Sequence, residues 1–211
     1  MVHIFISKIN LEQALVQTVE ALKKGCIVAY PTETFYGLGV KFDLEDSLKR
    51  LYDLKKRARD KAMPLIFGDK RLLPLVARSA NRNALLLMKD FWPGPLTLIL
   101  RSKNNISGYI TAGTGKVAVR IPGKSFALSL AQKADFFITA TSANPSGMTP
   151  AQDAETVVRY FGDKIDIVID VGPTPGGLPS TIMDVTERKM RILREGAISK
   201  ESVDEFFKKI S

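Results

Sequence analysis

Short apolar runs separated by amphipathic segments recur along this chain, and this alternation is the feature that most limits its fold. The runs are three to five residues long, which is too short for helices and typical of strands buried inside a sheet. They lie at residues 26–29, 65–67, 96–100, 117–121, 136–138, 165–169, 182–185 and 190–193. Some neighbouring runs are joined by connections too short for a helical crossover. The sequence therefore predicts an α/β fold with a twisted, mixed, open sheet flanked by helices.

Helical periodicity fills the intervals between these runs. Asn10 and Gln13 resemble a capping box, and the apolar residues that follow share one helical face, which ends at Gly25. Further helices are predicted at 44–56, 72–78, 81–91, 126–133 and 154–161, with a short amphipathic helix at about 199–210. We expect a single domain over residues 1–211.

Composition excludes several classes of protein. Hydrophobic residues make up 45% and charged residues 25% of the 211 residues, as in ordinary globular proteins. No apolar run approaches the roughly 18 residues that span a bilayer, and the first residues lack the pattern of a signal peptide. We therefore expect a cytoplasmic protein with no membrane contact.

The chain has one cysteine, Cys26, and one histidine, His3. An internal disulfide, a soft-ligand zinc site and a histidine-based catalytic triad are thus excluded within one chain. Because Cys26 lies in an apolar run, we expect it to be a small buried core residue.

The net charge is +9, from 31 Lys and Arg against 22 Asp and Glu. Such an excess favours polyanionic partners, namely nucleotides or nucleic acid. Solvated surfaces also carry many lysines, so charge alone does not decide the partner.

A polar segment from Tyr30 to Gly39 follows the apolar run at 26–29. It packs two threonine hydroxyls, one carboxylate and two glycines between aromatic rings. Open α/β sheets bind ligands at strand ends, so this segment predicts a pocket.

Five cations stand within residues 55–61, directly after the predicted second helix. Two readings are open. The cluster is either a solvated helix end, or a phosphate site in which Arg provides a planar set of paired N–H donors and Lys a single positive charge.

Three other places combine polar side chains with strand ends. Residues 139–147 carry a run of hydroxyl and amide groups, which let a ligand approach the backbone closely. Arg120 lies in an apolar strand, on the same face as Ala118, and is either snorkelling at an edge or aimed at an anion. Ser180 and Thr181 stand at a loop–strand junction and are candidate ligands.

Residues 91–97 combine Trp92 with two prolines, which indicates a turn with a core anchor. Walker, dinucleotide-binding and His-Glu-x-x-His motifs are absent from the sequence. A nucleotide site must therefore be of another design.

Taken together, these segments resemble the YrdC-like family of threonylcarbamoyl-AMP synthases. The resemblance runs in order through nearly the whole chain: residues 30–39, Lys55-x-Arg57, residues 92–97, residues 120–122, Ser142-Ala143-Asn144, residues 180–182 and residues 194–196. It implies a twisted α/β sheet with a concave basic cavity, and a single catalytic domain.

The resemblance also implies a nucleotidyltransferase that condenses L-threonine, bicarbonate or CO2, and ATP into threonylcarbamoyl-AMP and pyrophosphate. The product would serve tRNA threonylcarbamoyladenosine modification, in concert with downstream threonylcarbamoyl-transferase proteins. Mg²⁺ is expected with ATP.

Matched to the family motifs, Thr34, Arg120 and Ser180 would bind threonine. ATP would be bound by Lys55, Arg57, Lys61, Ser142, Asn144 and Arg194, with Lys55 and Arg57 as the catalytic pair. Tyr30, Phe35 and Tyr36 are then expected to be walls of the cavity. Glu33 is left with three readings: a magnesium ligand, a residue that orients the turn, or a cap on a backbone amide.

The sequence departs from the family pattern in two places. Many members carry a histidine shortly after the Pro-Leu that here is Pro64-Leu65, where this chain has Phe67-Gly68-Asp69. Thr149-Pro150 replaces the usual Pro-Ser. The main rival to the enzyme is a non-catalytic module that binds double-stranded RNA or tRNA on the same basic surface.

Overall fold

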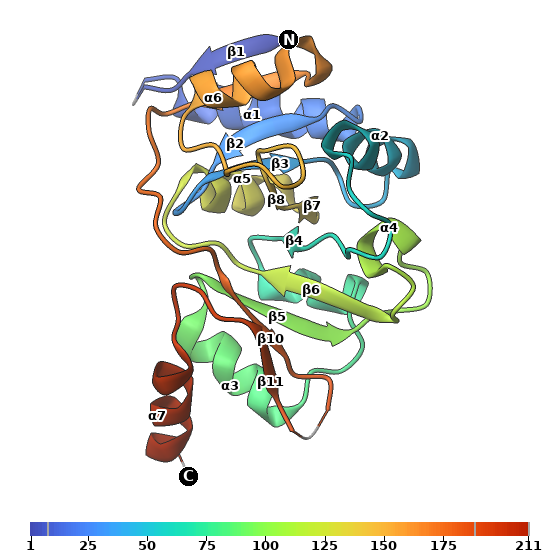
Figure 1. Cartoon of the computed structure of the whole chain (residues 1–211), viewed down its shortest axis with the longest axis vertical. Helices are drawn as coiled ribbons and strands as arrows, with labels where there is room; N and C mark the ends of the chain where they lie inside the picture. The colour runs from blue at the N-terminus through green and yellow to red at the C-terminus, as the bar shows by residue number, and fades with distance from the viewer. Residues whose placement is uncertain (8, 188, 211) are drawn as a thin grey trace.

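The computed structural model describes residues 1–7, 9–187 and 189–210. Within these residues the strands form two mixed sheets, which lie one above the other in Figure 1. The five-stranded sheet has the order β1 (Val2–Phe5), β9 (Ile167–Asp170), β2 (Val28–Pro31), β3 (Tyr36–Gly39) and β8 (Thr141–Ser142). The six-stranded sheet has the order β11 (Arg191–Arg194), β10 (Thr181–Asp184), β5 (Leu96–Arg101), β6 (Lys116–Arg120), β4 (Leu65–Ile66) and β7 (Ile138–Thr139).

The α/β class and the mixed pairing are confirmed, but the strands divide between two sheets where the sequence predicted one. The chain passes from one sheet to the other after β3 and after β9, and also between β7 and β8, at Ala140. Both strands are only two residues long, and the hydroxyl-rich run that contains them showed no strand pattern beyond Ile138. Periodicity therefore could not reveal the change of sheet.

The helices agree with prediction in most places. They are α1 (Leu11–Lys23), α2 (Glu45–Lys55), α3 (Arg82–Phe91), α4 (Gly108–Thr111), α5 (Phe126–Ala134), α6 (Ala154–Phe161) and α7 (Lys200–Ile210), with 3₁₀ turns η1 (Lys70–Leu75) and η2 (Gly162–Lys164). The predicted helix at 72–78 is wrong in type and position, because η1 contains Pro74, which cannot donate a helical hydrogen bond.

The capping box predicted at Asn10 is also wrong. The Asn10 side chain makes no cap bond to α1. It accepts hydrogen bonds from the Ser7 backbone N–H and hydroxyl, and it donates to the Phe5 carbonyl. Asn10 thus fastens the loop between β1 and α1 instead of the helix start.

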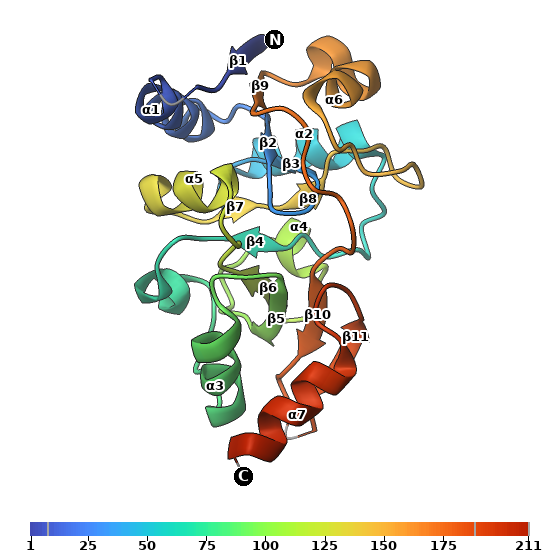
Figure 2. The same cartoon turned by 90° about the vertical axis from the view of Figure 1, so that its left-hand side faces the viewer.

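Helices cover both faces of the five-stranded sheet. Helices α1 and α5 lie on one face and α6 on the other, as Figure 2 shows. Alternation along β2 explains the division, since Val28 and Tyr30 belong to the cluster under α1 and α5, while Ala29 faces the larger cluster. Cys26 is only partly buried at the edge of the smaller cluster, so it is not the fully buried core residue expected.

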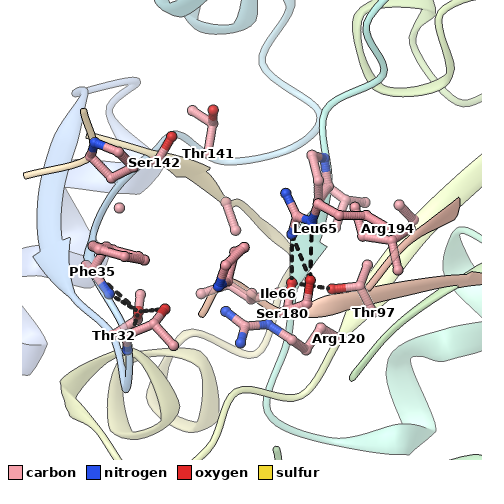
Figure 3. A pocket seen from close by; sticks show the side chains of 18 of the residues that line it. Thr32, Phe35, Leu65, Ile66, Thr97, Arg120, Thr141, Ser142, Ser180 and Arg194 are labelled. Atoms are coloured by element: carbon pink, nitrogen blue, oxygen red, sulfur yellow. Dashed lines mark hydrogen bonds between the residues drawn. The ribbon is translucent and has the colours of Figure 1, made fainter. Parts of the chain in front are cut away.

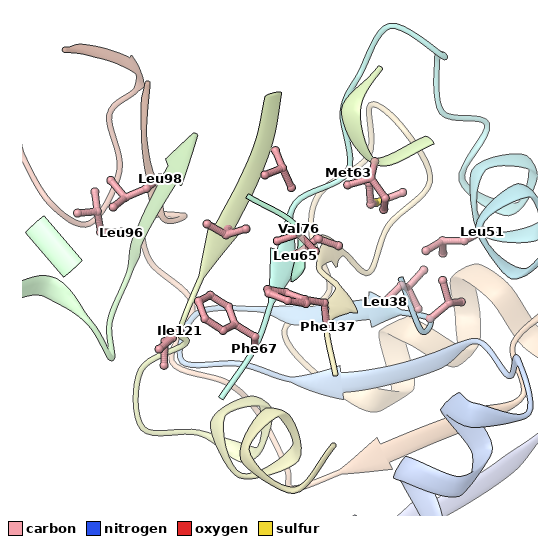
Figure 4. Close-up of a cluster of buried hydrophobic side chains, with 14 of the residues drawn as sticks. Leu38, Leu51, Met63, Leu65, Phe67, Val76, Leu96, Leu98, Ile121 and Phe137 are labelled. Carbon is pink, nitrogen blue, oxygen red and sulfur yellow. The ribbon is translucent and has the colours of Figure 1, made fainter. Parts of the chain in front are cut away.

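The larger apolar cluster continues between the two sheets (Figure 4). The Phe67 ring packs against Phe137 and Trp92, with centroids 4.8 and 5.6 Å away. Trp92 is buried and donates from its indole N–H to the Leu96 carbonyl, which confirms the predicted core anchor. In the described residues no helix is long and apolar enough to cross a membrane.

At the other end of the molecule, α7 packs beside α3 through the Phe206 and Phe91 rings, whose centroids are 5.4 Å apart (Figure 2). The core joins the sheets, and residues of both sheets line a cavity.

Candidate functional site

A cavity of about 630 Å³ is lined by residues of both sheets (Figure 3). Its walls come from the turn between β2 and β3, from β4, β5, β6, β8, β10 and β11, and from the loops at 57–64 and 179–180. Three arginines, Arg57, Arg120 and Arg194, are among the lining residues, and no carboxylate is. The cavity is therefore suited to an anionic ligand.

The turn between β2 and β3 confirms the pocket predicted from the segment 30–39. The Thr32 hydroxyl organises this turn by accepting from the backbone N–H groups of Thr34 and Phe35 and by donating to the Phe35 carbonyl, at 2.7 to 3.2 Å. Thr34 thereby faces the cavity with its hydroxyl 3.2 Å from that of Thr32. Tyr30, Phe35 and Tyr36 line the cavity as walls.

Arg120 ends β6 and is buried, with its Nη1 in an ion pair with the Glu33 carboxylate. It lines the cavity together with Ala118, as alternation along the strand predicted. Since it is buried, the snorkelling reading is wrong. An ion pair with Arg120 was also not among the three roles that the sequence suggested for Glu33.

A second polar group surrounds Ser180, which directly precedes β10. The Ser180 hydroxyl lies 3.0 Å from that of Thr97, and the Arg194 guanidinium donates to the Ser180 carbonyl and hydroxyl. Burial, and then the positive charge of Arg120, lower the pKa of Arg194. Two cations that face the same cavity stabilise a bound anion.

Thr181, in contrast, is wrongly predicted as a ligand. It is fully buried, and its hydroxyl donates to the Ile198 carbonyl and accepts from the Gly196 and Ile198 backbone N–H groups. The hydrogen-bonding groups of this hydroxyl are therefore paired within the protein and do not face the cavity.

Arg57 extends into the cavity from the loop after α2. Its guanidinium donates to the carbonyls of Lys61 and Ala62, and it lies over the Tyr52 ring, 5.9 Å from the centroid. The solvated-helix-end reading therefore fails for Arg57. Lys61 lies in the same loop, is exposed and does not line the cavity.

Lys55 lies behind the cavity wall instead of in it. Its side chain is buried, and its amine donates to the backbone carbonyls of Ser142 and Asn144. Burial, and then the charge of Arg57, lower its pKa to about 7. Lys55 thus connects the end of α2 to the strand that presents Ser142 to the cavity.

Asn144 is likewise outside the cavity lining. Its amide donates to the carbonyls of Pro145 and Met148, while its Oδ1 is buried without a partner in the described residues. The structure therefore brings six of the predicted site residues together at the cavity: Thr34, Arg57, Arg120, Ser142, Ser180 and Arg194. Lys55, Lys61 and Asn144 do not line it.

Sequence reasoning missed Thr97 as a lining residue, and it did not single out Thr32 or Thr141 within the two polar segments that contain them. Thr97 follows the turn at Trp92 in an otherwise apolar strand, and this isolated hydroxyl was the signal available. Among the described residues no cluster of His, Cys, Asp or Glu could hold a metal ion.

Comparison with known proteins places this chain in a family. The family model Sua5_yciO_yrdC, described as telomere recombination, matches residues 20–196. Over 183 residues the chain is 37% identical to threonylcarbamoyl-AMP synthase of Pyrococcus abyssi, covering 87% of this chain and 54% of that protein. Over 190 residues it is 34% identical to the synthase of Vibrio parahaemolyticus, covering 89% of this chain and 99% of that protein.

Solved structures agree. P. abyssi Sua5 complexed with L-threonine matches with a TM-score of 0.90 at 33% identity, over 97% of this chain and 60% of that one. Escherichia coli YciO, at 23% identity and a TM-score of 0.80 over 93% of this chain and 94% of that one, shares the fold. The chain spans about half the length of the synthases of P. abyssi and Bacillus subtilis. By sequence and by fold, and as its motifs predicted, the chain belongs to the Sua5/YciO/YrdC family.

Proposed function

We propose that this chain is an L-threonylcarbamoyladenylate synthase. It would condense L-threonine, bicarbonate or CO2, and ATP, with release of pyrophosphate, as a nucleotidyltransferase. The observation that carries the proposal is the set of three arginines and several hydroxyls around one cavity of about 630 Å³ without a carboxylate among the lining residues. The relatives named as synthases, and the related structure that holds L-threonine, support it.

The proposed threonine site lies between the two sheets. Arg120, which lines the cavity, would pair with the amino acid carboxylate, because its planar guanidinium can donate two hydrogen bonds to it. The hydroxyls of Thr34 and Ser180 supply short polar contacts at the same cavity. Apolar side chains such as Ile66 and Ile182 then surround the remainder of a small substrate.

The proposed ATP site uses Arg57, Ser142 and Arg194. In the reaction, an oxygen of N-carboxylated threonine attacks the α-phosphorus of ATP, and the bond from that phosphorus to the bridging oxygen breaks as pyrophosphate leaves. Two anions must approach each other, so fixed cations matter more than an acid–base pair. The hydrogen bond from Arg194 to Ser180 supports a proposal in which the two subsites adjoin.

Lys55, Asn144 and Lys61 were predicted to contact ATP. We retain them as predicted site residues. In this arrangement Lys55 binds the backbone carbonyls of Ser142 and Asn144, and the Asn144 side chain binds the loop that follows, at Pro145 and Met148. Mg²⁺ is proposed to enter with ATP, held by phosphate oxygens, because the described residues offer no carboxylate cluster for it. The product would be used in tRNA modification by downstream transferase proteins in the cytoplasm.

The direct test is to incubate the pure protein with ATP, L-threonine and labelled bicarbonate. We expect label in an adenylate whose formation requires threonine. No such product over a range of pH and Mg²⁺ would overturn the proposal. RNA affinity that falls steeply with salt, without turnover, would support the RNA-binding rival instead.

Arg57→Ala should reduce turnover by about 10²-fold if Arg57 stabilises charge in the transition state. The matched control is Lys56→Asn, since Lys56 is exposed in the same basic cluster, and its left-handed backbone at φ 49° tolerates Asn. Equal turnover in the two variants would remove Arg57 from the mechanism.

A further inference from the structure

The ion pair between Glu33 and Arg120 joins the two sheets at the cavity. Glu33 lies in the turn between β2 and β3 of the five-stranded sheet, whereas Arg120 ends β6 of the six-stranded sheet. The two residues are 87 positions apart in sequence. The pair thus fixes the threonine-rich turn relative to the strand on the other side.

Burial shows that this contact is not an ordinary surface ion pair. The side chains are 9% exposed for Arg120 and 16% exposed for Glu33. The second carboxylate oxygen of Glu33, Oε2, is buried without a hydrogen-bond partner in the described residues. Because a buried ion pair rarely stabilises a fold more than apolar packing would, stability alone does not account for a carboxylate at this place.

The backbone is shaped to admit the Glu33 side chain. A Cβ at Gly123 would lie 3.3 Å from Glu33 Cγ, which is tighter than most Cβ contacts, and 3.5 Å from its Cδ, which is an ordinary contact. Glycine at position 123 therefore leaves room for Glu33 beside Arg120.

Within the described residues, only one edge of the Arg120 guanidinium makes a hydrogen bond. Nη1 pairs with Glu33, and no acceptor for Nε or Nη2 occurs in the described part of the chain. Arg120 nevertheless lines the cavity, and Glu33 does not. The remaining donors can therefore bind a carboxylate in the cavity while Glu33 keeps its contact.

We propose that Glu33 is a positioning residue, which acts through Arg120 by holding its guanidinium in the orientation that binds the substrate's α-carboxylate. The identity of the amino acid rests on the proposed function. Without Glu33, a buried and unpaired Arg120 would turn toward water. Threonine binding would weaken, and ATP binding would not.

The test compares Glu33→Gln with the unchanged protein by calorimetric titration with L-threonine and, separately, with a non-hydrolysable ATP analogue. Glutamine keeps the shape against Gly123 and removes the charge. We expect threonine affinity to fall about tenfold, as for coupled residues in contact, and the affinity for the analogue to change less than twofold. Asp184→Asn is the matched control, since it removes the ion pair of Lys116 on the same strand β6, away from the cavity.

A double-mutant cycle separates positioning from direct contact. Glu33→Gln should cause no further loss of threonine affinity in an Arg120→Leu background. Gly123→Ala gives a second route if Glu33→Gln fails to fold, because it displaces Glu33 by a few tenths of an ångström without changing charge, and we expect a smaller loss. Unchanged or tighter threonine binding in Glu33→Gln, or additive losses in the cycle, would overturn the proposal.

Because binding is measured without turnover, the outcomes distinguish the two proposals. Threonine binding that depends on Glu33 in a protein that forms no adenylate would refute the proposed function and support the role of Glu33. Absence of L-threonine binding to the unchanged protein would refute both.

Discussion

At the residue scale, Lys55 shows how burial changes what a basic side chain does. The sequence predicted that the Lys55 ammonium binds phosphate. In the structure, its amine instead donates hydrogen bonds to two backbone carbonyls behind the cavity wall. A neutral amine has enough N–H groups to donate to both carbonyls. Because charge is costly at this buried position, the pKa of Lys55 falls from an ordinary 10.5 to about 7.

The pKa of Lys55 leads to a prediction about stability and pH. Between about pH 7 and pH 10 the unfolded chain binds more protons at Lys55 than the folded one, so the contribution of Lys55 to the free energy of unfolding rises with pH. That contribution is fully present above pH 10.5 and is lost as the pH falls to about 7. The difference in free energy of unfolding between the unchanged protein and Lys55→Met should increase by roughly 1 kcal/mol per pH unit in this window. Urea unfolding at a series of pH values measures it, and a constant difference would contradict the lowered pKa.

Thr181 and Ser180 are neighbours in sequence with separate tasks. Thr181→Val removes a hydroxyl that holds the segment 196–198 to β10, and leaves buried polar groups without partners. We expect a loss of roughly 2 kcal/mol in the free energy of unfolding, measured with urea.

Ser180→Ala is the comparison, since Ser180 faces the cavity. It should weaken threonine binding and leave most of the stability. The opposite pattern, with binding impaired in Thr181→Val and stability impaired in Ser180→Ala, would show that the two roles are reversed.

At the scale of elements, β3 depends on a glycine. A Cβ at Gly39 would lie 2.7 Å from each of three atoms: Ile138 Cγ2, Thr139 O and Tyr30 Cε1. Gly39→Ala should therefore displace β3 from its neighbours and lower the free energy of unfolding by about 1–3 kcal/mol. Thermal or urea unfolding measures the loss. Gly108→Ala, where a Cβ meets nothing within 4 Å, is the control, and equal effects at both positions would exclude crowding as the cause.

Outside the 72–78 segment, element types followed from sequence where a period of apolar residues extended over several positions. Helices α2, α3, α5 and α6 begin and end within one residue of prediction. The strands β3 and β8 were missed, because β3 pairs through a polar, glycine-rich segment and β8 is two residues long. These two segments are strands because they pair with neighbouring strands, and the local sequence says little about which segments will pair.

At the scale of the whole molecule, the cavity has walls from both sheets, so a ligand bound there contacts both halves of the structure. L-threonine together with a non-hydrolysable ATP analogue should raise the midpoint of a single thermal transition. At a hundredfold excess over the dissociation constant the stabilisation is about 2.7 kcal/mol. Differential scanning calorimetry measures it, and two transitions of which only one shifts would contradict a shared site.

The sequence by itself determined the class of elements, most of their positions, and a set of motifs that identified the family. These depend on periodicity and on residue types at fixed spacing, which are local properties of the chain. Only the tertiary structure decided that there are two sheets among the described residues, that the buried Lys55 amine binds two backbone carbonyls, and that Glu33 and Arg120 form an ion pair between the sheets. Each of these depends on contacts between residues far apart in sequence, 87 positions for Glu33 and Arg120, and burial then sets the charge and orientation that the side chain adopts.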